Sequence, residues 1–224
     1  MSPKVRGVGT SSELQELLRQ VPVKGHPALR PYRNARIAVE RLQVDSLVPL
    51  AKYVLQTQLD YLTTLQRDLH CAGFNLFELE GILSFQHARS SRRIAPPVVE
   101  VSQDGSNLLV DGLHRAWIAE RAGEVVLSCA VIREVSTPLV PLPVEWKDIC
   151  VYAPGHNPRE EDKRDFRFTS ADAVRQVVGE FSGSVTEENF RYFLYRDLEV
   201  LGSAGIRAID DPIELANEED AIES

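Results

Sequence analysis

The amino-acid sequence predicts an α+β protein, because segments with the periodicity of strands and of helices both occur in it. In residues 94–132, two short apolar runs flank an Asp-Gly turn, and a helical run and a third apolar run follow. Residues 50–71 place apolar side chains near helical spacing. Two further helical patterns, over 171–181 and 186–201, predict a mostly helical C-terminal extension.

Before the central stretch, the predicted elements are short. We expect residues 1–10 to be loose and residues 13–20 to form a small amphipathic helix. Apolar and charged residues alternate over 36–42, which predicts a strand. Residues 76–85, interrupted by a glycine, are interpreted as a second helix or helical turn, and the basic run 87–93 as a loop.

The central stretch predicts three strands and one helix. A double proline introduces a strand over Pro97–Val101, and turn residues separate it from a second strand over Asn107–Val110. A helix over Leu113–Ala122 follows and ends at Gly123, and Val125–Ile132 is the third strand. A strand at 148–152 is expected later in the chain.

Chemistry is expected at the turn between the second strand and the helix. Gly112 lets a ligand approach the backbone, and the helix that follows offers unpaired N–H groups to an anion. His114 and Arg115 add side-chain donors there. Asp111 repels an anion, so it holds Mg²⁺, accepts a substrate hydroxyl or caps the helix. A purely structural turn with a solvated His-Arg pair is the alternative.

The segments PPVVEV and LLVDGLHRAWIAERAG resemble the ParB/sulfiredoxin-like fold superfamily, closely over residues 94–132 and more loosely over 36–133. The resemblance implies a small mixed sheet with flanking helices, in which this turn binds nucleotide phosphates. The pattern Asp-Gly-X-His-Arg is most similar to the free serine kinase branch. The catalytic cysteine of sulfiredoxin would fall at Leu113, which argues against sulfinic acid repair.

By this resemblance, the chain is expected to bind ATP or ADP, with CTP as a further candidate, together with Mg²⁺. The reaction would be phosphoryl transfer to a small hydroxylated metabolite, or nucleotide hydrolysis. A glutamate before the turn serves as the base in kinase-like relatives, and Glu80 is preferred to Glu78 for that role. The nucleotide-binding residues would be Gly112, Leu113, His114 and Arg115, the catalytic residues Asp111, His114 and Glu80, and the metal ligand Asp111.

Two other functions stay open: a DNA-associated partition or nuclease protein, and a non-catalytic interaction module. The formal net charge of the chain is −8, and residues 208–224 carry −7 of it, which leaves −1 for the other 207 residues. A near-neutral body argues against duplex DNA as the main partner. The arginines at 89, 92 and 93 are expected to close over phosphates, to hold a carboxylate substrate or to belong to a solvated connection.

The sequence is divided into four parts. They are an N-terminal arm with a short helix (1–35), a nucleotide-binding domain (36–136), a helical extension (137–208) and a disordered acidic tail (209–224). Three cysteines without metal-ligand spacing, and the absence of an apolar run of about 20 residues, predict a cytoplasmic protein without a membrane partner. The apolar faces of the extension pack on the body or on a second subunit, which leaves a homodimer open.

Overall fold

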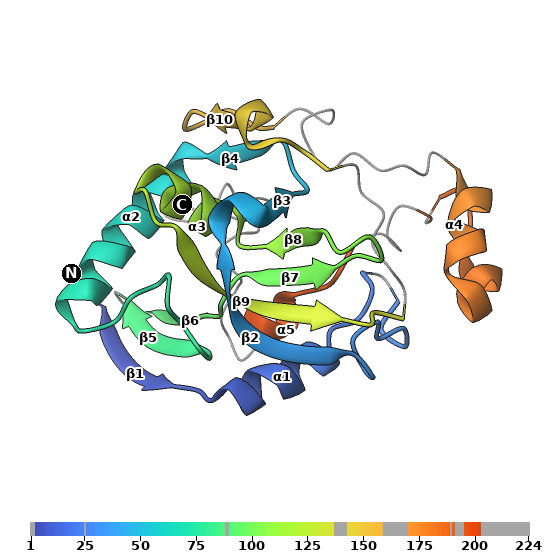
Figure 1. Ribbon diagram of the computed structural model, residues 1–224, viewed down its shortest axis with the longest axis horizontal. Coiled ribbons are helices and arrows are strands. Elements are labelled where there is room, and N and C mark those ends of the chain that lie inside the picture. Colours follow the sequence, from blue (N-terminus) through green and yellow to red (C-terminus); the bar gives the residue numbers. More distant parts are fainter. Residues whose placement is uncertain are drawn as a thin grey trace, which may run out of the picture.

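The computed structural model describes residues 3–24, 26–87, 90–136, 143–158, 170–188, 190 and 195–202. Arg89 and the predicted acidic tail, residues 209–224, lie outside the described residues. Within the described part of the chain, the strands form three sheets with helices packed beside them (Figure 1). The predicted α+β class is confirmed.

The central sheet is mixed, as expected. Its five strands follow the order β2 (Arg36–Gln43), β9 (Val126–Arg133), β7 (Val98–Val101), β8 (Asn107–Asp111) and β3 (Leu47–Pro49). The pairs β2–β9 and β7–β8 are antiparallel, and β9–β7 and β8–β3 are parallel. Strand β9 is buried over six consecutive residues, because both faces of the sheet are covered.

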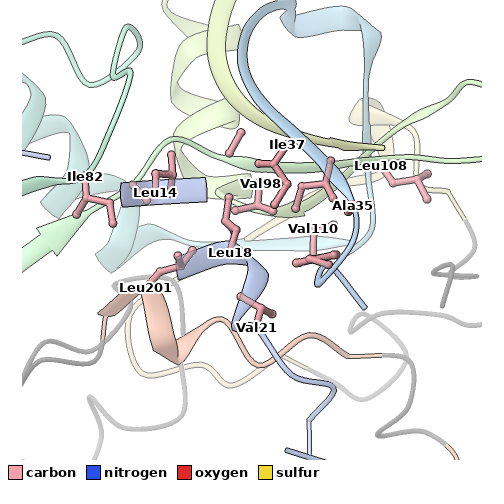
Figure 2. Close-up of a cluster of buried hydrophobic side chains, with 14 of the residues drawn as sticks. Leu14, Leu18, Val21, Ala35, Ile37, Ile82, Val98, Leu108, Val110 and Leu201 are labelled. Carbon is pink, nitrogen blue, oxygen red and sulfur yellow. The ribbon is translucent and has the colours of Figure 1, made fainter. Parts of the chain in front are cut away.

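The two covering layers on the sheet come from helices distant in the sequence. Helix α1 (Ser11–Arg19) begins with a capping box between Thr10 and Glu13. Its Leu14 and Leu18 pack with Val98 of β7 on one face of the sheet (Figure 2). Helix α3 (Leu113–Arg121) covers the other face through its small residues Ala116 and Ala119.

A second sheet corrects three predictions. The strands β1 (Lys4–Val8), β5 (Leu83–His87) and β6 (Ser90–Ile94) pair antiparallel in the order β1-β5-β6. The loose N-terminus, the helix over 76–85 and the loop over 87–93 were therefore wrong predictions. The period-two alternation of β5 decides the outcome: Leu83 and Phe85 are fully buried between more exposed polar neighbours. A Cβ placed on Gly81 would clash with the carbonyl oxygen of Gly9, so a side chain has no room at this position.

A third sheet shortens the predicted 50–71 helix. Residues Tyr53–Leu55 form β4, which pairs in parallel with β10 (Cys150–Tyr152), and helix α2 covers Gln56–Cys71. The expected strand at 148–152 is thus present in shortened form. Short 3-10 turns occur at η1 (Val44–Ser46), η2 (Trp146–Asp148) and η4 (Gly179–Ser184).

The C-terminal extension is tied to the body of the chain. Helix α4 (Ala171–Val177) has the predicted Ser170 cap. The predicted helix over 186–201 is wrong as one continuous element, because Arg196 forms a β-bridge with Val23; among the described residues of this stretch, the α-helix is α5 (Glu199–Gly202). Arg196, which is 6% exposed, pairs with the buried Glu100 of β7 at 2.8 Å between Nε and Oε1. The extension therefore packs on the first half of its own chain. No helix among the described residues has the length and apolar character needed to cross a bilayer.

Candidate functional site

Gly112 sets the geometry of the predicted turn. It is the N-cap of α3 and lies in the left-handed region with φ of 89°. A Cβ placed on Gly112 would lie 2.7 Å from the Cβ of Pro97, so a side chain has no room there. The glycine is thus required by the backbone conformation and by close packing, in addition to any approach of a ligand.

His114 lies inside the protein and connects two helices. The residue is 5% exposed, and its Nε2 accepts a hydrogen bond from the backbone N–H of Leu55 at 3.0 Å. Burial lowers the pKa of His114 to about 4, although the charge of Asp111 acts to raise it. The ring is therefore neutral near pH 7, and its Nε2 serves as an acceptor; its predicted role as a donor to phosphate stays a prediction.

Arg115 is also buried, at 3% exposure, and its guanidinium is held by the body of the protein. Its Nη1 donates to the carbonyl of Ala95, and its Nη2 lies 3.7 Å from Oδ2 of Asp111. The side chain of Asp111 is 20% exposed, so this carboxylate is the member of the pair nearer to solvent. A buried arginine needs such partners because an unpaired buried charge is costly.

The N-termini of α2 and α3 meet at the His114–Leu55 hydrogen bond. Leu55 is the N-cap of α2, and Gly112 is the N-cap of α3. Neither cap residue bonds its helix through a side chain, and neither first turn contains an acidic residue. Figure 1 shows α2, α3 and β4 side by side. Two uncapped helix ends therefore bring their partial positive charges to one place, which is suited to an anion.

Gln58 is a candidate that the sequence analysis missed. It is the third residue of α2 and is 3% exposed. A polar side chain at the start of α2 can reach an anion bound at that helix end, which makes Gln58 a candidate contact for a ligand. The sequence contains one signal for this residue, because a polar Gln58 interrupts the apolar stripe of leucines along the helix.

The predicted base, Glu80, and the predicted metal site have less support from the geometry. Glu80 is exposed in the turn before β5 and makes no hydrogen bond or ion pair with the described residues, so its role as a base stays a prediction. Glu78 lies 3.4 Å from Arg41 instead. Within the described part of the chain, no group of three or more His, Cys, Asp or Glu side chains is arranged to hold a metal ion. Any Mg²⁺ at Asp111 would therefore need its other oxygen ligands from water or from a bound ligand.

A cavity of about 290 Å³ lies elsewhere, beside Glu100, Ser102, Leu108 and Glu134. It is at the far ends of β7 and β8 from the turn, because Pro97 and Asp111 stand at the opposite ends of these strands.

The mixed sheet and the Asp-Gly turn leading into α3 place the protein in the ParB-like class. A family model described as the ParB CE domain matches residues 13–150, more than half of the chain. The chain belongs to the ParB CE domain family. Neither the curated proteins nor the solved structures give a match to it.

Proposed function

We propose that the protein binds a nucleoside phosphate, ATP or ADP with CTP as a further candidate, where the N-termini of α2 and α3 meet. The observation that carries this proposal is the hydrogen bond from Leu55 to His114, which joins two helix ends without side-chain caps. The N-termini of two helices at one place favour a phosphate more strongly than the N-terminus of one helix. Membership in a ParB-like family supports the same choice.

Each residue of the proposed site has a separate role. His114 positions the two helix ends and stays neutral, because its pKa is lowered to about 4. Arg115 contributes positive charge from its buried position, in which Asp111 and the Ala95 carbonyl orient the guanidinium. Gln58 donates its amide to the ligand.

Phosphoryl transfer to a small hydroxylated metabolite, or to water, is the proposed reaction. Such transfer depends on positioning and on charge neutralisation, which helix ends and an arginine supply. Asp111 is the residue that would hold Mg²⁺, together with oxygens of the nucleotide, because its carboxylate is at the solvent side of the turn. When bound, the ion would neutralise phosphate charge.

Calorimetric titration with ATP, ADP and CTP, with and without Mg²⁺, tests this proposal. Wild-type protein is expected to bind at least one of them. Gln58→Leu should weaken that binding roughly tenfold, the value of one lost hydrogen bond.

Gln66→Leu is the matched control on the same helix. The Gln66 amide is satisfied by Asn75 and by the N–H of Leu76, so this change should destabilise the fold by about 1–2 kcal/mol and leave nucleotide affinity unchanged. No heat with any nucleotide would refute the proposed binding. Equal affinity in wild type and Gln58→Leu would remove Gln58 from the site.

For the reaction, release or transfer of phosphate should disappear in Asp111→Asn while nucleotide still binds, because the amide keeps the size of the side chain and loses its charge. Unchanged turnover in Asp111→Asn would contradict the assigned role of this carboxylate.

A further inference from the structure

Two tyrosines stand together beside the N-terminus of α2. Tyr53 of β4 and Tyr152 of β10 have ring centroids 6.1 Å apart and planes at 82°, an edge-to-face pair. Both side chains are half-buried and keep exposed surface. They come from segments about a hundred residues apart, so only the parallel pairing of β4 with β10 brings them together.

The register of this two-stranded sheet places the two tyrosines on one face. Val54, between Tyr53 and Leu55, is fully buried in a cluster with Trp117 on the opposite face. Side chains alternate along a strand, so Tyr53 and Leu55 point to the other face. Tyr152 is the register partner of Leu55 and shares that face.

Leu55 connects the tyrosine pair to the proposed phosphate site. It is the N-cap of α2, its N–H donates to His114, and its Cα is about 5 Å from that of Tyr152, the spacing of neighbouring strands. An aromatic surface therefore adjoins the two helix N-termini directly.

We infer that Tyr53 and Tyr152 form the binding surface for the aromatic base of the nucleotide, so that the site selects nucleoside phosphates over inorganic polyphosphates. This inference rests on the proposed function and adds the class of ligand to it. Aromatic side chains offer a π-face on which any base stacks, and stacking contributes affinity that phosphate contacts do not supply. The two tyrosines come from strands in different regions of the chain, so the affinity of this surface for the base depends on the β4–β10 pairing.

The test compares ATP with inorganic tripolyphosphate, which carries the phosphates and no base. Wild-type protein is expected to bind ATP roughly tenfold or more tightly than tripolyphosphate. Tyr152→Leu keeps apolar volume and removes the ring, so it should lower ATP affinity by that factor and leave tripolyphosphate affinity unchanged. Tyr152→Phe is the matched control, because it keeps the ring and should bind both ligands as wild type does.

Each outcome has one meaning. If ATP and tripolyphosphate bind equally to wild type, or if Tyr152→Leu leaves the preference for ATP intact, the proposed binding surface for the base is refuted and the proposed phosphate site is retained. If neither ligand binds wild type, the proposed function itself fails. Should Tyr152→Leu not fold, saturation-transfer NMR on wild type decides: the strongest signal is expected on the base protons of ATP, and a stronger signal on the ribose protons overturns the inference.

Discussion

His114 is expected to make the fold sensitive to mild acid. Burial lowers the pKa of its imidazole to about 4 in the folded protein, against an ordinary value of 6.5 that applies to the unfolded chain. Between these values the unfolded state binds more protons than the folded state. The contribution of the neutral ring to stability is therefore complete above pH 6.5 and is lost as the pH falls towards 4. The difference in pKa corresponds to about 3 kcal/mol in total.

Urea unfolding, followed by tryptophan fluorescence at about pH 7.5 and about pH 4.5, measures this loss. Trp117 of α3 stacks with Trp146 at 6.5 Å between ring centroids, so the emission of the two tryptophans reports on the packing around that helix. At about pH 4.5 most of the difference is realised, and His114 should account for about 2.5 kcal/mol of destabilisation.

His114→Gln separates the histidine from the carboxylates that also titrate in this range. The glutamine carbonyl oxygen replaces Nε2 as the acceptor for the Leu55 N–H and does not take up a proton. The variant should lose about 2.5 kcal/mol less than wild type over the same pH interval. A loss equal to that of wild type would mean that His114 is not the buried neutral acceptor described here.

Two further predictions concern the turn and the C-terminal extension. Gly112→Ala should lower the free energy of unfolding by roughly 2–5 kcal/mol, because the new Cβ meets Pro97 and the φ of this residue is positive. Gly105→Ala is the control: its φ is also positive but the space around it is open, so it should lower the free energy of unfolding by only about 1–2 kcal/mol. Equal losses of the two variants in urea unfolding would contradict the packing argument. Arg196→Met should cost about 3–5 kcal/mol, because Glu100 is left buried and charged. Adding Glu100→Leu to this variant should recover part of that loss in thermal unfolding, and no recovery would show that the ion pair is not the cause.

The elements with strong local signals were predicted well. The strand at β2, the turn with its positive-φ Gly105 and the helix ended by Gly123 follow from alternation and from turn chemistry over a few neighbouring residues. The predictions failed at β1, β5 and β6, because these strands are only five residues long and gain stability by pairing with one another. The 186–201 segment failed for the same reason, since Arg196 is held in an extended conformation by Val23 and Glu100.

For the candidate site, residue types and spacing were enough to locate the Asp-Gly turn and the helix that starts at Leu113. They did not reveal that His114 and Arg115 turn inward, because burial depends on what α2 and Ala95 bring against the turn. Gln58 and the Tyr53–Tyr152 pair likewise emerge only in the folded chain. Local periodicity is a property of consecutive residues, whereas the meeting of two helix ends and two distant tyrosines depends on long-range packing that no short segment contains.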